Sequence, residues 1–149
     1  MKKNNSSNFT VVIDTRERRP YEYEGAVTGT LKSGDYSILG LEDRVAVERK
    51  TKEDAFSSLG ASRGRFEKEL ERLSGYDYGA IVIESNLDDF LNPPAFTRMN
   101  PKAAINSLVS WSVKYKVFIF FASDRRHAMA LVYRILEKYW KHRDDTRTN

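Results

Sequence analysis

The sequence predicts an α/β protein in which a central mixed β-sheet is flanked by helices. Short segments rich in β-branched residues come first, beginning at residues 9–13. Two continuous apolar runs of strand length follow, at 80–83 and 117–121, and segments with helical spacing stand between and after them. Strands that alternate with helices pack as layers, with the helices on the faces of the sheet.

The composition fits one globular domain with a basic surplus. Its 149 residues are enough for one core and too few for two ordinary domains. The net charge of +4 and a pI of about 9.3 favour a polyanionic partner, although many basic domains bind none. The absence of cysteine excludes disulfides and Cys-ligated zinc. No apolar run approaches the roughly 18 residues that a membrane-spanning helix needs.

Three parts are expected along the chain: a disordered leader at 1–8, one folded domain at 9–141 and a flexible tail at 142–149. The leader is charged but has no apolar stretch behind it, so it is not a signal peptide. We therefore expect a cytoplasmic protein.

Four strands are expected before the first helix. The strand at 9–13 ends at Asp14. The next three are expected to form a meander because turn residues join them: strands 27–31, 36–39 and 44–48, with turns at 33–35 and 40–43.

Helix starts are marked by capping residues. Thr51 and Asp54 have the form of a capping box, and Asn100 before Pro101 is a favourable helix entry. Ser123 or Asp124 is expected to cap the last helix. The expected helices are 55–59, 65–73, 101 to about 114, and 125 to about 140.

Charged residues stand where the expected strands end or bend: Asp14, Asp35 and Glu48, with Lys50 two residues later. Side chains at i and i+2 project from one face of a strand, so Glu48 and Lys50 should lie side by side. Carboxylate oxygens suit a hard divalent ion such as Mg²⁺. A nearby lysine can orient a water or stabilise phosphate charge. An aspartate followed by Glu-x-Lys is the arrangement of PD-(D/E)xK nucleases.

The same segments resemble the nuclease domain of the XPF and Hef family of structure-specific endonucleases. That family carries Asp-x-Arg-Glu after its first strand, then a Gly-Asp turn, then Glu-Arg-Lys-x-x-x-Asp. The resemblance covers about residues 9–140 and implies a restriction-endonuclease-like PD-(D/E)xK core. The matching segments are 14–17, 34–35 and 48–54, with further likeness at 65–73 and 80–84.

The resemblance implies an endonuclease that nicks branched duplex DNA (flap, fork or junction) with Mg²⁺ or Mn²⁺ and leaves a 5′-phosphate and a 3′-hydroxyl. Asp35 and Glu48 would bind the metal, Asp14 would complete the acidic cluster, and Lys50 would act as base or position the water. The supporting residues would be Arg16, Glu17, Arg49 and Asp54.

Simpler roles compete for these supporting residues. Asp54 could do no more than help cap a helix. Arg16 and Arg49 could pair with the acidic cluster rather than touch DNA, and Glu17 could be a solvated loop charge. For DNA phosphates the candidates are Arg63 and Arg65, with a weaker case for Lys102, although a charged helix face is more often only solvated.

Assembly and substrate are left open by the sequence. We expect a homodimer, with a partner protein as a further source of DNA-binding surface. Aromatic residues such as Trp111 and Tyr139 belong either to the core or to an interface. Family members append helix-hairpin-helix motifs that are missing here, which suggests a stand-alone bacterial or phage enzyme. The rival functions are a less specific phage-type nickase or junction resolvase, an RNA nuclease, and a non-catalytic DNA-binding partner.

Overall fold

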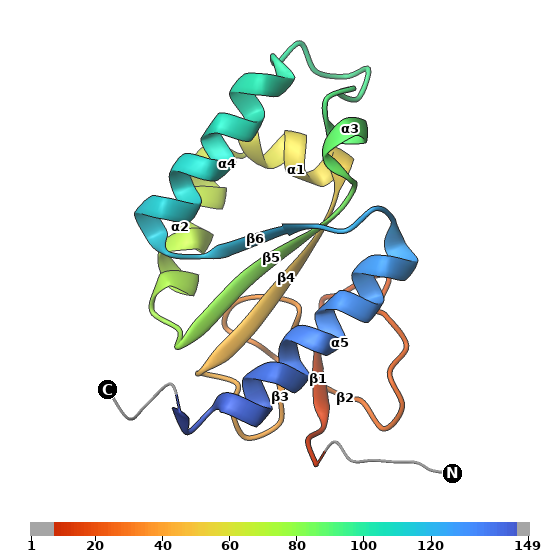
Figure 1. Cartoon of the computed structure of the whole chain (residues 1–149), viewed down its shortest axis with the longest axis vertical. Coiled ribbons are helices and arrows are strands. Elements are labelled where there is room, and N and C mark those ends of the chain that lie inside the picture. The colour runs from red at the N-terminus through yellow and green to blue at the C-terminus, as the bar shows by residue number, and fades with distance from the viewer. Residues whose placement is uncertain (1–7, 146–149) are drawn as a thin grey trace.

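The computed structural model describes residues 8–145 and is built on one six-stranded sheet with the order β2-β1-β3-β4-β5-β6 (Figure 1). Helices lie on both faces of this sheet, which confirms the expected fold class. The leader predicted at 1–8 lies almost wholly outside the described residues, as does the end of the predicted tail. The strands are β1 Val11–Asp14, β2 Val27–Gly29, β3 Tyr36–Ile38, β4 Val45–Thr51, β5 Tyr78–Glu84 and β6 Phe118–Phe121.

The expected meander is wrong for β2 but confirmed for the pairing of β3 with β4. β2 pairs in parallel with β1 and lies at the sheet edge, while β1 pairs antiparallel with β3. β3 then pairs antiparallel with β4, and β4, β5 and β6 run parallel. Burial explains the order: all four residues of β1 are buried and need neighbours on both sides, whereas β2 is largely exposed and tolerates an edge.

Two helical layers enclose the sheet (Figure 1). One face carries four helices, whose buried residues share a core with Ala46, Ile81 and Ile83. The other face is covered by α5, which packs on Val45, Val47 and strand β1. The short α3 was not expected from the sequence. The helices are α1 Lys52–Leu59, α2 Arg63–Ser74, α3 Leu87–Phe90, α4 Pro101–Tyr115 and α5 Arg125–His142.

The helix entries follow the capping residues. The side chain of Thr51 accepts a hydrogen bond from Asp54 N at 3.0 Å. Asn100 caps α4 and Asp124 caps α5 in the same way. These three caps confirm the expected helix starts, and Asp124 rather than Ser123 opens α5.

Side chains alternate along β4, so this one strand serves both layers. Val45 and Val47 lie in the core beneath α5, and Ala46 lies in the core beneath α2. Continuing the alternation, Lys50 sits over the ring of Phe66 on α2 at 4.9 Å. Arg49 points to the other layer, where its guanidinium lies 5.6 Å from the centre of the Tyr21 ring. Glu48 and Lys50 therefore share one face, as expected.

The expected strand at 117–121 forms at Phe118–Phe121, but the expectation that it is buried is wrong. β6 lies at the sheet edge; half of the Phe118 side chain is exposed, and its other residues are only partly buried. Trp111 and Tyr139, by contrast, are 5% exposed and belong to the core of this single chain. No helix in residues 8–145 is both long and apolar enough to cross a membrane.

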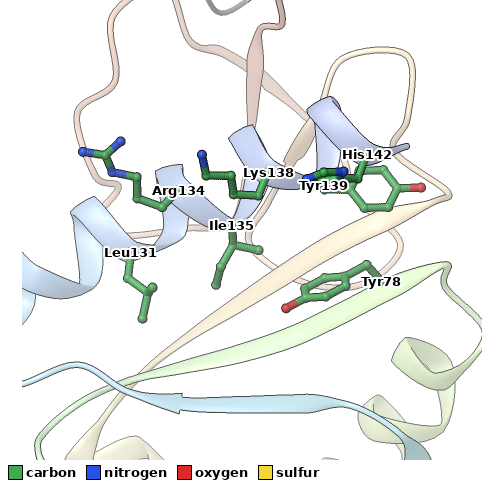
Figure 2. Close-up of a pocket in the computed structure, with 7 residues that line it drawn as sticks. All are labelled: Tyr78, Leu131, Arg134, Ile135, Lys138, Tyr139 and His142. Carbon is green, nitrogen blue, oxygen red and sulfur yellow. The ribbon is translucent and has the colours of Figure 1, made fainter. Parts of the chain in front are cut away.

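An apolar groove of about 360 Å³ runs between α5 and the start of β5 (Figure 2). Leu131 and Ile135 line it together with the ring of Tyr78. It shares no lining residue with the clefts around Asp35. The groove is thus separate from the acidic residues that the sequence singled out.

Candidate active site

Backbone hydrogen bonds between neighbouring strands bring the acidic segments together. Asp14 N donates to Asp35 O at 2.8 Å, and Asp35 N donates to Val47 O at 2.9 Å. Gly34 makes this approach possible, because a side chain at its position would lie 3.0 Å from Ala46 Cβ. Its φ of +80° is also one that glycine adopts without strain. Asp35 is thereby fixed beside Glu48.

Asp35 and Glu48 line the same cleft, and the pKa of each is raised above its ordinary value. Burial raises the pKa of Asp35 to about 7, with further contributions from nearby Glu17 and Glu69; a hydrogen bond from Arg49 N at 2.8 Å acts against this rise. Burial also raises the pKa of Glu48 well above its ordinary value, and the charges of Asp35 and Glu69 add to the effect. A cation between the two carboxylates would relieve this repulsion.

Lys50 lies beside this pair. Its Nζ stands 3.8 Å from Glu48 Oε2, and its side chain is 11% exposed. The ammonium borders both the cleft with Asp35 and Glu48 and the neighbouring cleft between α1 and α2. Lys50 is thus placed where a phosphate or its attacking water would approach the carboxylates.

Arg49 and Glu17 form a bidentate ion pair on the α5 side of β4. The guanidinium donates to Glu17 Oε2 at 2.9 Å and to Oε1 at 3.0 Å. Burial by itself would raise the pKa of Glu17, but the bonds from Arg49 lower it below its ordinary value. Both side chains are less than a tenth exposed. The pairing alternative is therefore realised for Arg49, and Glu17 is no solvated loop charge.

Asp14 is engaged by its own loop. Its oxygens accept from Arg16 Nε at 2.9 Å and from Leu31 N at 2.8 Å. Burial works to raise the pKa of Asp14, but these bonds hold it below its ordinary value. Asp14 borders the cleft that contains Asp35 and Glu48. Its role as a metal ligand stays a prediction, and a metal would compete there with Arg16.

The predicted DNA contacts separate in space. Arg65 lines the cleft between α1 and α2 next to Lys50. Arg63 instead stacks on Trp111 at 4.5 Å and donates to Leu59 O, on the α4 side. Lys102 lies on the first turn of α4 and lines none of the clefts around Asp35. Asp54 lines two of these clefts, so its position allows a role beyond the cap.

Sequence reasoning assigned no role to several charged residues that the fold brings here. Glu69 is close enough to perturb both Asp35 and Glu48. It stands three residues after buried Phe66, so the helical pattern could have placed it on the inner face of α2. Arg18 and Arg19 line the cleft from the loop after β1. No local pattern distinguishes these two from other loop cations.

The donor set suits a small hard cation, although no closed cage is present. Within residues 8–145, no three His, Asp or Glu side chains converge closely enough to hold a metal ion by themselves. Mg²⁺ does not need such a cage, since one or two carboxylates, several waters and substrate phosphates commonly complete its shell. Asp35 and Glu48 are the residues that would hold it.

Residues 13–135 match the family model of the ERCC4 domain. This chain belongs to the ERCC4 domain family. The match contains each strand of the sheet except the first two residues of β1, and every acidic residue of the cleft. The acidic cleft is therefore part of the region that defines this domain.

Archaeal relatives share the domain within longer proteins. The "3′-flap repair endonuclease Xpf" of Saccharolobus solfataricus is 30% identical over 110 residues, 73% of this chain and 43% of that protein. A Methanocaldococcus jannaschii protein named as an ATP-dependent RNA helicase is 26% identical over 132 residues, 86% of this chain and 15% of that protein. The chain thus spans less than half of either relative.

Solved structures confirm the fold of this ERCC4 domain. XPF from Aeropyrum pernix matches with a TM-score of 0.71 and 21% identity, covering 93% of this chain and 68% of that one. Its complex with DNA matches with a TM-score of 0.69 and 23% identity, covering 89% and 65%. The sheet and its flanking helices are therefore those of an XPF nuclease domain, a restriction-endonuclease-like fold.

Proposed function

We propose that this chain is a divalent-metal-dependent DNA endonuclease that nicks branched duplex DNA at a flap, fork or junction. The observation that carries the proposal is the cleft itself. Asp35 and Glu48 line it with raised pKa values, and Lys50 stands beside Glu48. The archaeal relative named as a 3′-flap endonuclease and the DNA-bound XPF structure support DNA as the substrate.

Each group then has a distinct task in hydrolysis. Water oxygen bonds to phosphorus and gives up a proton, the bond from phosphorus to the 3′ oxygen breaks, and the 3′ oxygen takes up a proton, so that one water is consumed. Asp35 and Glu48 would hold a divalent cation, which would supply Lewis-acid stabilisation of the phosphate charge. Lys50 orients the attacking water or stabilises charge at the phosphate. Arg49 keeps its side chain on Glu17, while its N–H fixes the Asp35 carboxylate.

The test is cleavage of a substrate panel with Mg²⁺ or Mn²⁺. The panel contains linear duplex, fork, flap, four-way junction, single-stranded DNA and RNA. We expect nicking of branched DNA, and a fall of about three orders of magnitude in Asp35→Ala and Lys50→Ala, the scale of lost electrostatic stabilisation. Binding of the fork should survive both changes. Asp43→Ala, an exposed acid at the opposite end of β4, is the matched control and should cut like wild type.

The outcomes separate the rival functions. Fork binding without cleavage under either metal would replace the enzyme by a non-catalytic DNA-binding partner. Equal cutting of all duplex forms would indicate a less specific nickase. Preferential cutting of RNA would indicate an RNA nuclease. Equal activity in wild type, Asp35→Ala and Lys50→Ala would reveal a contaminating nuclease.

We also propose a homodimer, formed through the edge strand β6 and helix α4. An apolar groove of about 170 Å³ lies between them, lined by Ile119 and Phe121 of β6. Val109 and Val113 on its α4 side are 57% and 73% exposed. An unpaired strand edge beside an exposed apolar surface is a site where a second copy can add.

A further inference from the structure

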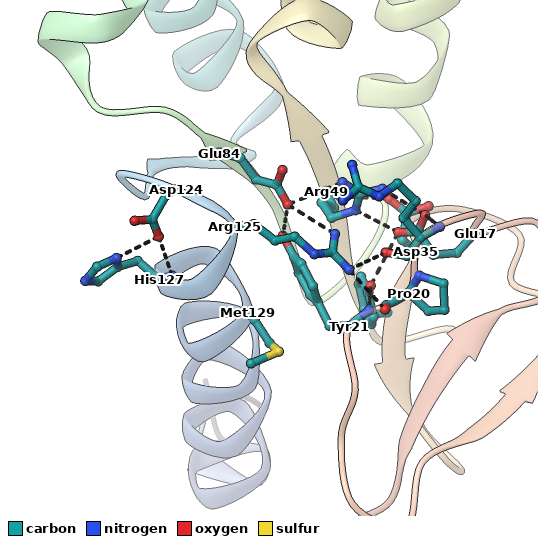
Figure 3. A network of polar contacts seen from close by, with 12 residues as sticks. Glu17, Pro20, Tyr21, Asp35, Arg49, Glu84, Asp124, Arg125, His127 and Met129 are labelled. Atoms are coloured by element: carbon teal, nitrogen blue, oxygen red, sulfur yellow. Dashed lines mark hydrogen bonds and ion pairs between the residues drawn. The ribbon is translucent and has the colours of Figure 1, made fainter.

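Arg125, in the first turn of α5, lies next to the loop that follows β1, although more than 100 residues separate them in sequence (Figure 3). Its Nη2 donates to two successive carbonyls of that loop, Arg19 O at 2.9 Å and Pro20 O at 3.1 Å. Its guanidinium also lies 4.8 Å from the centre of the Tyr21 ring. The Arg125 side chain therefore contacts three consecutive residues of the loop.

The second contact of Arg125 is Glu84, at the end of β5. Arg125 Nη1 is buried, has no hydrogen-bond partner within residues 8–145, and faces Glu84 Oε2 at 3.8 Å. The same Glu84 oxygen accepts from the Tyr21 hydroxyl and from Arg49 Nη1, the latter at 3.3 Å. Glu84 is thus the point at which α5, the loop and the Glu-Arg-Lys strand are joined (Figure 3).

The loop that Arg125 contacts places exposed arginine side chains along the cleft. Arg16, Arg18 and Arg19 line it together with Asp35 and Glu48. Arg125 itself lines none of the clefts around Asp35, and its hydrogen bonds point to the loop backbone. Side chains on a loop held in one conformation bind a phosphate backbone with less ordering cost than those on a free loop.

We propose that Arg125 is a positioning residue that holds the loop at residues 15–20 against α5 and Glu84; we call this set of contacts the Arg125 staple. The loop arginines are then held in one arrangement along the cleft, where they can contact DNA phosphates. The proposal rests on the proposed function for its consequence, but the staple itself is independent of it. A planar fork is needed, because one ammonium on a flexible stem cannot satisfy both carbonyls and face Glu84.

The test compares Arg125→Ala and Arg125→Lys with wild type and with Arg126→Ala. Arg126 is exposed, adjacent and of equal charge, so it controls for electrostatics. Hydrogen exchange should rise about tenfold at the amides of residues 16–19 in both Arg125 variants, with α5 and β5 unchanged. On flap DNA, KM should rise about five- to tenfold while kcat stays within twofold. Arg126→Ala should show neither effect.

Three results would overturn the staple. Arg125→Lys behaving as wild type would mean that only charge matters. Exchange that rises equally in the loop, α5 and β5 would indicate general destabilisation. A tenfold loss of kcat with unchanged KM would show that Arg125 does not act by positioning the loop for DNA binding. If wild type cuts no DNA, the proposed function fails, but the hydrogen-exchange data still test whether Arg125 holds the loop. If Arg125→Ala does not fold, the exchange data come from Arg125→Lys alone.

Discussion

At the scale of single residues, burial sets the protonation of the cleft. The pKa of Asp35 is about 7, against an ordinary value of 3.8, because its carboxylate is buried near other acids. In the folded state Asp35 therefore keeps its proton to higher pH than in the unfolded chain. Its contribution to stability is complete below about pH 4 and is lost as pH rises through 7.

Asp35→Asn should remove this loss. Without metal, we expect the variant to melt several degrees above wild type at pH 8, since about 1 kcal/mol shifts Tm by about 2–4 °C in a domain of this size. Near pH 4 the two should melt together. Added Mg²⁺ should raise Tm of wild type at pH 8 more than that of the variant. A wild type that is more stable than Asp35→Asn at pH 8 without metal would contradict the stated cause. Calorimetry over pH supplies the measurement.

The acidic residues and Lys50 could be found in sequence because each stands at a strand end or within two positions of another. The residues that contact and position them could not be found in the same way. Glu84 and Arg125 reach the site only when β5 and the start of α5 are placed in space, and a lone Glu after an apolar strand carries no signal. The choice between pairing and DNA contact for Arg49 likewise needed the position of Glu17.

At the scale of elements, the turn before β3 fixes how closely that strand approaches β4. Gly34 has a positive φ and no room for a side chain, with Val47 O at 3.2 Å from an added Cβ. Asp35 follows directly, and its N–H bonds that same Val47 O. The position of the Asp35 carboxylate therefore depends on this glycine.

Gly34→Ala should lower both stability and nicking. Backbone strain of this kind costs about 1–3 kcal/mol, and the clash with β4 adds to it. Gly40→Ala is the matched control: its φ of +89° is equally unusual, but an added Cβ meets nothing within 4 Å. We expect it to lose some stability and to keep full activity. If the two variants lose nicking equally at a temperature where both are folded, the close approach at Gly34 is not what positions Asp35. Thermal melts and nicking rates decide this.

Element types could largely be predicted, but pairing could not. Alternation and capping residues located the strands and four helices to within a few residues, since those signals are local. The order β2-β1-β3 depends instead on which strand can be buried on both sides, a comparison between segments distant in sequence. For the same reason β6 looked central by its apolar run and proved to be an edge.

At the scale of the whole molecule, the sheet has an edge that the described residues leave uncovered on the β6 side. The aromatic residues considered for an interface, Trp111 and Tyr139, are already buried within one chain. The exposed apolar surface comes from smaller residues on α4, which the sequence pattern did not distinguish from core positions because apolar content alone does not reveal which face is covered.

Val113→Asp should therefore dissociate the proposed dimer without unfolding the chain, because it places a charge in an apolar interface while staying solvated in the monomer. Leu39→Asp, which changes another exposed apolar residue in the turn after β3, should leave the dimer intact. Sedimentation velocity over a concentration series measures both. Wild type that sediments as a monomer throughout, or a Val113→Asp dimer of unchanged strength, would refute this interface.

The alternation along β4 has a consequence for how such domains can change over generations. A single residue inserted between Glu48 and Arg49 would exchange the faces of the residues that follow, turning Arg49 toward the carboxylates and Lys50 away from them. The three register pairs that follow Glu48, from Arg49 to Thr51, would be shifted relative to β5 at once. Length variation within 45–51 should therefore be purged from active lineages, whereas the exposed connection at 91–100 can grow or shrink freely.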